Sequence, residues 1–238
     1  MKILVIGGCG FTGTNLVNEL IKLGHKVLVV DVQWFGNHLK RNKNLKVVKQ
    51  DVRNIESKLF KGINTIVHLA NIANDPSVEL NQSLSWEVNV LATKKIIEFA
   101  IDNKVNHFIY ASSGSVYGIK KEKKVTEKLA CTPISTYNKT KMIAERVLYS
   151  YSNKIKIHCI RPATVCGFSP RMRFDVSVNM FIYQALSKNK IKVFGGQQIR
   201  PNINIKDLVN VYVHFINNPK IKSGNYNAGF ENLKIINI

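Results

Sequence analysis

Short runs of apolar, β-branched residues alternate along the chain with longer stretches in which apolar residues recur every three or four positions. The short runs are apolar nearly throughout, as in parallel strands that are covered on both faces. The longer stretches are typical of amphipathic helices. In the first of them Leu16, Leu20 and Leu23 share one face, and Gly24 suits a helix end. The predicted strands are 2–7, 26–31, 45–50, 64–70, 107–112 and 155–162, and the predicted helices are 12–24, 84–103 and 135–152.

Alternation of strands and helices over 1–162 predicts an α/β fold with a doubly wound parallel sheet. Beyond Pro162 the rhythm loosens into a predicted helix over 176–188, a short strand over 191–194 and a helix near 207–217. We therefore expect a nucleotide-binding Rossmann domain over 1–162. A small, incomplete substrate-binding part over 163–238 would be interleaved with the last strands of the sheet.

The glycines of GGCGFTG (7–13) lie between the first predicted strand and the first predicted helix. Glycine permits a tight turn and lets backbone N–H groups approach a pyrophosphate at the helix N-terminus. Asp31 ends the second predicted strand, 18 residues after Gly13. Its carboxylate would accept hydrogen bonds from a ribose diol and repel a 2′-phosphate, which favours NAD over NADP. The residues predicted to form the phosphate site are Gly7, Gly10, Phe11, Thr12 and Gly13.

Tyr137 and Lys141 are four residues apart in a predicted helix and therefore lie on one face of it. A tyrosine is a poor acid or base near neutral pH because its ordinary pKa is about 10. A neighbouring ammonium group stabilises the phenolate and lowers that pKa, so proton exchange with a substrate hydroxyl becomes feasible. The stretch ASSGSVYG (111–118) follows the preceding predicted strand and is either an ordinary turn or a second part of this site.

The ordered set of motifs resembles the extended short-chain dehydrogenase/reductase family, in its branch of nucleotide-sugar epimerases and dehydratases. The resemblance runs along the whole chain, and within this branch the chain is similar to UDP-glucose 4-epimerases. The matching motifs are GGCGFTG (7–13), Asp31, DVR (51–53), HLA (68–70), Asn89, SSGSVYG (112–118), YNKTK (137–141), RP (161–162) and IRPNINIKD (199–207).

This resemblance implies NAD as cofactor and assigns roles to the matching positions. Ser113 would hydrogen-bond the reacting hydroxyl, Tyr137 would be the acid and base, and Lys141 would also hold the nicotinamide ribose. Asn179 and Arg200 would face the nucleotide sugar. The further positions expected at the cofactor are Asp51, Val52, Leu69, Ala70, Asn89, Ser112 and Pro162.

The residues before Val116 narrow the reaction. Dehydratases of the family that resemble this chain carry Thr-Asp-Glu there, and the related decarboxylases keep a glutamate, whereas this chain has Ser113, Gly114 and Ser115. The resemblance therefore favours chemistry confined to C4 of the sugar, either epimerisation or simple oxidation and reduction.

The segment RPATVCGFSPRMRFD (161–175) is similar to a subgroup associated with surface-polysaccharide sugars, which includes GDP-heptose 4-dehydrogenases. Thr164 stands where most of the family has asparagine, and we expect it to face the substrate. Arg171 and Arg173 either contact a phosphate or a sugar hydroxyl or belong to a solvated basic loop.

The formal net charge of +20 comes from lysines scattered through the chain. No basic run carries interleaved aromatic residues, so a solvated surface is favoured over nucleic-acid binding, and a basic cleft would attract a phosphate ester. The four cysteines show neither disulfide nor metal-ligand spacing, so we expect a reducing cytoplasm and no metal. No apolar run reaches the roughly 18 residues of a membrane helix.

Three alternatives remain open at this point. The chain is an NAD-dependent nucleotide-sugar enzyme, a non-catalytic NAD-binding protein that binds nucleic acid through its basic surface, or an inactive remnant. The last two are kept because relatives of this type usually continue well beyond ENLKIINI (231–238), where a helix is predicted to begin. As an active enzyme it is expected to form a homodimer through the helices at 84–103 and 135–152.

Overall fold

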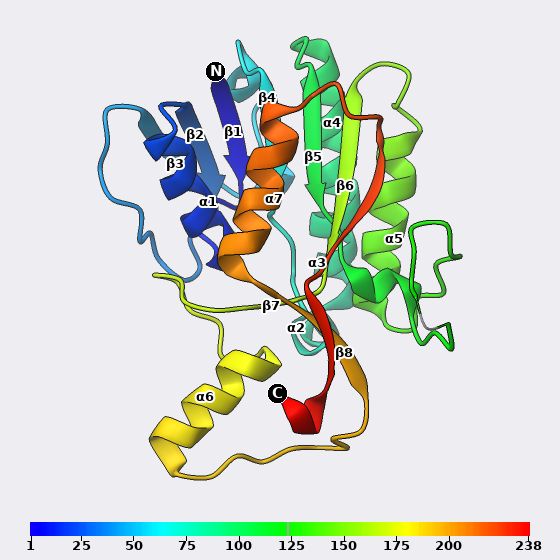
Figure 1. Cartoon of the computed structure of the whole chain (residues 1–238). Helices are drawn as coiled ribbons and strands as arrows, with labels where there is room; N and C mark the ends of the chain where they lie inside the picture. Colours follow the sequence, from blue (N-terminus) through cyan, green and yellow to red (C-terminus); the bar gives the residue numbers. More distant parts are fainter. Residues whose placement is uncertain (123) are drawn as a thin grey trace.

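Seven parallel strands form the main sheet of the computed structural model, which describes residues 1–122 and 124–238 (Figure 1). Their order is β3-β2-β1-β4-β5-β6-β9, so the chain reverses direction across the sheet between β1 and β4. This order confirms the predicted doubly wound Rossmann fold, in which ligands bind beyond the carboxyl ends of the strands at that reversal. The strands are β1 Lys2–Ile6, β2 Lys26–Asp31, β3 Leu45–Lys49, β4 Thr65–His68, β5 His107–Ala111, β6 Lys156–Pro162 and β9 Gly224–Ala228.

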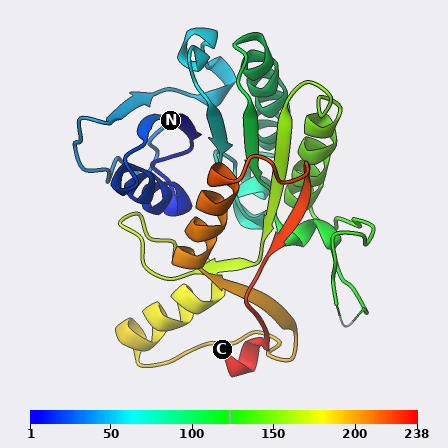
Figure 2. The ribbon, with the colours of Figure 1, turned by 45° about the horizontal axis from the view of Figure 1, so that its top comes forward.

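Helices cover both faces of this sheet (Figures 1 and 2). Leu4 of β1 packs into the hydrophobic core on the α4 and α5 side, and its neighbour Val5 packs into the core on the α1 and α7 side. Both side chains are fully buried, which explains why the strands are apolar at consecutive positions. The covering helices are α1 Phe11–Lys22, α4 Ala92–Asp102, α5 Thr136–Tyr149 and α7 Ile205–Asn217.

A second sheet of three strands lies beyond the carboxyl ends of the main strands (Figure 2). Its order is β10-β8-β7, with β7 parallel and β10 antiparallel to β8. The predicted helix near the chain end is wrong, because 231–234 pairs with β8 as a strand. The predicted strand over 191–194 is also absent, since that segment is irregular and mostly exposed. The elements here are β7 Thr164–Cys166, α6 Ser177–Lys188, β8 Ile199–Asn204 and β10 Glu231–Lys234.

The helix predicted over 84–103 consists of three pieces: α3 (Gln82–Trp86), a π-helical turn (Glu87–Leu91) and α4. It is preceded by the short α2 (Asp75–Leu80) and packs beside α5 on one face of the sheet. Dimerisation through these helices stays a prediction. In the described part of the chain, no helix combines the length and apolar character needed to cross a membrane.

Candidate active site

The carboxyl ends of the main strands and the small sheet enclose a cleft of about 2430 Å³. All the site residues predicted from the sequence line this cleft except Asn89 and Asn179. One continuous space therefore runs from the glycine loop to Tyr137 and on to Arg200, although these residues are far apart in the sequence. Its size suits a dinucleotide and a second large ligand together.

The glycine loop packs so tightly on itself and on the loop after β4 that two of its positions have no room for a side chain. A Cβ atom on Gly13 would lie 2.3 Å from the Gly7 carbonyl oxygen, and one on Gly7 would lie 2.5 Å from the Ala70 nitrogen. Within the described residues, no side chain caps the start of α1, and its first turn holds no acidic residue. The first N–H groups of the helix therefore face the cleft without competition, as a pyrophosphate requires.

Asp31 is fixed at the end of β2 by two backbone donors. Its carboxylate accepts hydrogen bonds from the Cys9 N–H at 2.9 Å and from the Gln33 N–H at 2.6 Å. The acid is thus held beside the glycine loop, where a ribose diol would lie, and the arrangement fits NAD.

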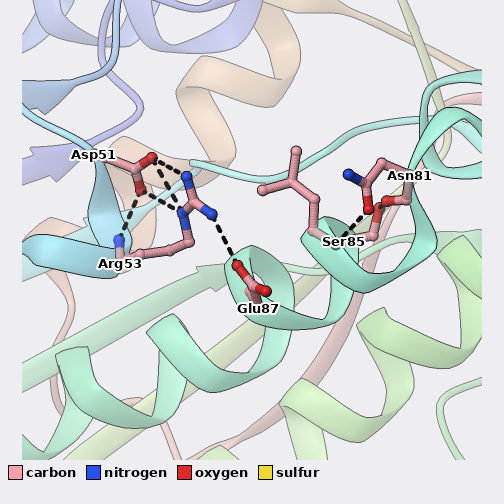
Figure 3. Close-up of polar contacts among 6 residues, drawn as sticks. Asp51, Arg53, Asn81, Ser85 and Glu87 are labelled. Atoms are coloured by element: carbon pink, nitrogen blue, oxygen red, sulfur yellow. Dashed lines mark hydrogen bonds and ion pairs between the residues drawn. The ribbon is translucent and has the colours of Figure 1, made fainter.

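The Asp51 carboxylate accepts hydrogen bonds from the nearby Arg53, as Figure 3 shows. The Arg53 guanidinium binds both Asp51 oxygens at 2.8–3.2 Å and reaches Glu87 of the π-helical turn at 2.8 Å. The side-chain hydrogen bonds to Arg53 lower the pKa of Asp51. One turn earlier Asn81 caps α3 and its carbonyl accepts from the Ser85 hydroxyl at 3.0 Å. The bonds from Arg53 hold Asp51 at the edge of the cleft at which the adenine is expected.

The predicted catalytic residues come together from β5 and α5. Ser113 caps the 3₁₀ turn Gly114–Tyr117, and its hydroxyl lies 2.7 Å from that of Ser115. The Lys141 ammonium donates to the Ala111 carbonyl at 2.6 Å and lies 5.8 Å from the centre of the Tyr137 ring. ASSGSVYG is therefore part of the site and not an isolated surface turn.

The titration of these groups differs from the expectation based on the sequence. Burial raises the pKa of Tyr137, and the groups that oppose this rise are the Arg173 guanidinium and the Ser113 hydroxyl. Burial also lowers the pKa of Lys141 to about 7, against a smaller opposing effect of Glu145. The prediction that Lys141 lowers the pKa of Tyr137 is thus not met, because burial dominates both groups and the ammonium points to Ala111.

A buried ion pair that the sequence did not reveal lies directly behind this site. Glu145 accepts from Arg161 through two nitrogens, at 2.9 and 2.6 Å, and both side chains are 3% exposed. The Ser112 hydroxyl donates to the same carboxylate at 2.5 Å, and Arg161 reaches the Tyr117 hydroxyl at 2.7 Å. Glu145 follows Lys141 by four residues, so helical periodicity alone could have placed it on the catalytic face.

Asn89 supports the site from behind and does not reach the cleft. Its side-chain oxygen accepts from the Ile72 N–H at 2.8 Å, and its nitrogen donates to the Thr140 hydroxyl at 3.0 Å. Thr140 in turn donates to the Tyr137 carbonyl at 2.7 Å. The π-helical turn thereby holds together the loop after β4 and the first turn of α5.

Asn179 is likewise structural in its contacts. It is 3% exposed, accepts from the Gly167 N–H at 2.9 Å and donates to the Arg173 carbonyl at 3.0 Å. Arg173 pairs with Asp175 at 2.6 Å, and Asp175 also accepts from Asn74. Among the other residues predicted to bind the substrate, Thr164 and Arg200 lie on β7 and β8 and line the cleft.

These features define a dinucleotide-binding enzyme of the Rossmann type, with a serine, a tyrosine and a lysine at the catalytic end of its cleft. The family model described as the NAD dependent epimerase/dehydratase family matches residues 3–229. The chain belongs to this family, so its cofactor is NAD and it is an enzyme related to those that act on nucleotide sugars. The predictions of family and cofactor are confirmed.

Individual relatives agree with this assignment. The chain is 32% identical to the uncharacterized UDP-glucose epimerase YtcB of Bacillus subtilis, over 96% of this chain and 77% of that protein. It is 26% identical to a UDP-glucose 4-epimerase of Lactobacillus helveticus, over 99% and 80% of the two chains. A Bacillus cereus UDP-glucuronic acid 4-epimerase was solved as a tyrosine-to-phenylalanine mutant with NAD and UDP-4-deoxy-4-fluoro-glucuronic acid. It superposes with a TM-score of 0.90 at 28% identity, covering 99% of this chain and 80% of that one.

In residues 1–122 and 124–238, histidine, cysteine and acidic side chains do not gather in any group of three or more suited to a metal ion.

Proposed function

We propose that this chain is a 4-epimerase of a nucleoside-diphosphate sugar. The observation that carries the proposal is the catalytic end of the cleft, where Ser113 and Ser115 form a hydroxyl pair beside Tyr137. The turn supplies no carboxylate at the positions where dehydration or decarboxylation of the sugar would need one. Similarity to a UDP-glucose 4-epimerase and to a UDP-glucuronic acid 4-epimerase supports the same reaction.

The residues divide the work of proton transfer and positioning. NAD, when bound, supplies the two-electron acceptor that C4 of the sugar needs and returns the same electrons afterwards. The first turn of α1 would hold its pyrophosphate, and Asp31 would hold its adenosine ribose. Tyr137 would take the proton of the C4 hydroxyl while Ser113 orients that hydroxyl. On the return step Tyr137 would give the proton back to the C4 oxygen, and inversion at C4 requires that the keto sugar first turn its opposite face towards the nicotinamide.

Burial raises the pKa of Tyr137, so loss of its proton needs positive charge nearby, and the Arg173 guanidinium supplies part of that charge. The Lys141 ammonium, held at the Ala111 carbonyl 5.8 Å from the ring, would instead serve to position the nicotinamide ribose. A bound NAD carries a positive nicotinamide ring, which would add to the Arg173 charge and favour the phenolate.

The proposal is tested with a panel of nucleoside-diphosphate sugars and the full chain loaded with NAD, with the products identified by NMR. We expect one sugar to be converted to its C4 epimer without loss of water or carbon dioxide. In Tyr137→Phe the rate should fall by about 10²–10⁴-fold, because the acid and base is removed. The matched control is Tyr149→Phe on the same helix, whose hydroxyl donates to Asn225 at 3.0 Å outside the cleft.

Full activity of Tyr137→Phe would refute the catalytic role of Tyr137. A dehydrated or decarboxylated product would refute the epimerase assignment but would not contradict the catalytic role of Tyr137.

A further inference from the structure

The ten residues 167–176 between β7 and α6 form a strap along the cleft. Gly167 begins it with a φ of +115°, and its N–H is held by Asn179 at 2.9 Å. The strap is then tied to the glycine loop, because the buried Ser169 hydroxyl donates to the Phe11 carbonyl at 2.8 Å. Asn179 holds its middle through the Arg173 carbonyl. The strap is therefore anchored on the cofactor side of the cleft and on α6.

The next contact of the strap is with the loop after β2. The Arg171 guanidinium lies 3.8 Å from the centre of the Phe35 ring, a close cation–π stack. Phe35 is 63% exposed, so the packed core does not hold it in place. Arg171 and Phe35 both line the cleft, and Phe35 is four residues after Asp31.

The position of this stack identifies which ligand it covers. Asp31 marks the expected place of the adenosine ribose, and the Arg171 guanidinium interacts electrostatically with the Asp31 carboxylate. Arg173, two residues further along, is instead near Tyr137. Arg171 and Arg173 are also close enough to each other to interact, and it is the stack on Phe35, in the loop that follows Asp31, that places Arg171 at the adenosine end.

We propose that Arg171 and Phe35 form a clasp that closes the strap over the adenosine half of NAD and slows its release. In the closed form the clasp joins the strap to the loop after β2, while the Ser169 hydrogen bond joins the strap to the glycine loop. NAD leaves when the stack opens, so the dissociation rate depends on the strength of that stack. Arg171 is by this assignment a cofactor-retaining residue and not a ligand of the sugar.

Retention suits a reaction that consumes no net oxidant, because the same NAD serves every turnover. This last consequence rests on the proposed epimerase function, whereas the clasp itself needs only bound NAD.

The clasp is tested by the release of NAD from the full chain without any sugar. The protein is loaded with radiolabelled NAD and chased with an excess of unlabelled NAD, and the dissociation rate is compared among variants. A cation–π stack at an exposed site corresponds to about a twofold to fivefold faster release when either partner is removed. We expect this increase in Phe35→Ala and in Arg171→Gln, and no further increase in the double variant.

Two controls separate the clasp from general loosening. Phe35→Tyr keeps an aromatic ring and should release NAD at the wild-type rate. Phe168→Ala removes an aromatic side chain of the same strap that is 74% exposed and does not line the cleft, and it too should leave the rate unchanged.

Wild-type release rates in both Phe35→Ala and Arg171→Gln would overturn the proposal. Multiplied effects in the double variant would overturn the pairing, because two independent contacts would then be acting. Since no sugar is present, these outcomes do not depend on the epimerase assay. If no nucleoside-diphosphate sugar is epimerised but NAD release is faster in Phe35→Ala and Arg171→Gln as expected, only the proposed function is rejected.

Discussion

The buried pair of Glu145 and Arg161 allows a quantitative test of how the catalytic layer is held together. Glu145→Gln keeps the shape of the side chain and removes its charge. It leaves a guanidinium that is 3% exposed without its carboxylate, and it weakens the bonds at 2.9 and 2.6 Å from Arg161 and at 2.5 Å from Ser112. Removing one partner of such a buried pair costs about 3–5 kcal/mol of folding free energy.

For a chain of this length the loss corresponds to a fall in melting temperature of about 6–10 °C, at about 2 °C per kcal/mol. Urea and thermal unfolding of the full chain with saturating NAD measure it. Glu19→Gln is the matched control, because it removes the same charge from the surface pair with Lys22, whose side chain is 74% exposed. That control should change stability by less than about 1 kcal/mol.

A loss below about 1 kcal/mol in Glu145→Gln would refute the view that an uncompensated buried charge decides the effect. A second variant separates charge from packing. If Arg161→Met is added to Glu145→Leu, neither charge of the pair remains buried, and stability should return to within about 1–2 kcal/mol of the wild type. A double variant as unstable as Glu145→Gln would show that the geometry of the pair, and not its charge, is what the fold requires.

Two further predictions concern acid stability and the glycine loop. His107 and His158 are buried and hydrogen-bonded at 2.7 Å, and burial lowers the pKa of His107 to about 3. Below its ordinary value of about 6.5 only the unfolded state takes up this proton, so stability should be lost as the pH falls from about 6.5 towards 3, by up to about 1.4 kcal/mol per pH unit from His107. His107→Gln should flatten this slope in urea unfolding at pH 7 and pH 5, and an unchanged slope would contradict the reasoning. Gly13→Ala should weaken NAD binding at least about 100-fold in a titration, because its Cβ would lie 2.3 Å from the Gly7 oxygen. Binding as tight as in the control variant Gly224→Ala would contradict the proposed role of the glycine loop.

The main sheet and the glycine loop could be predicted from the sequence because their signals are local. A strand covered on both faces is apolar at consecutive positions, as in β1, and the loop needs glycine wherever a Cβ would clash. Tyr137 and Lys141 are four residues apart on one helix, so their common face follows from helical geometry alone.

The small sheet and the charge states depended on contacts that local patterns do not contain. The segment 199–204 is mostly exposed, carries a proline and becomes a strand by pairing with residues 231–234 and with β7. The pKa of Tyr137 depends on burial and on Arg173, which is 36 residues away in the sequence. The pairing of Glu145 with Arg161 required knowledge that α5 packs on β6, because a glutamate among helical residues usually faces water.

The strap joins two binding events into one thermodynamic system. Arg171 stacks on Phe35 at the adenosine end, and Arg173 reaches the neighbourhood of Tyr137 at the sugar end, with only Met172 between them. Whatever preference a sugar shows for the closed strap must reappear, as the same factor, in the affinity for NAD, because coupling between two sites is reciprocal. An NAD affinity measured on the sugar-free protein is then one side of a four-state cycle, and the affinity during turnover is the opposite side, measured with the sugar bound.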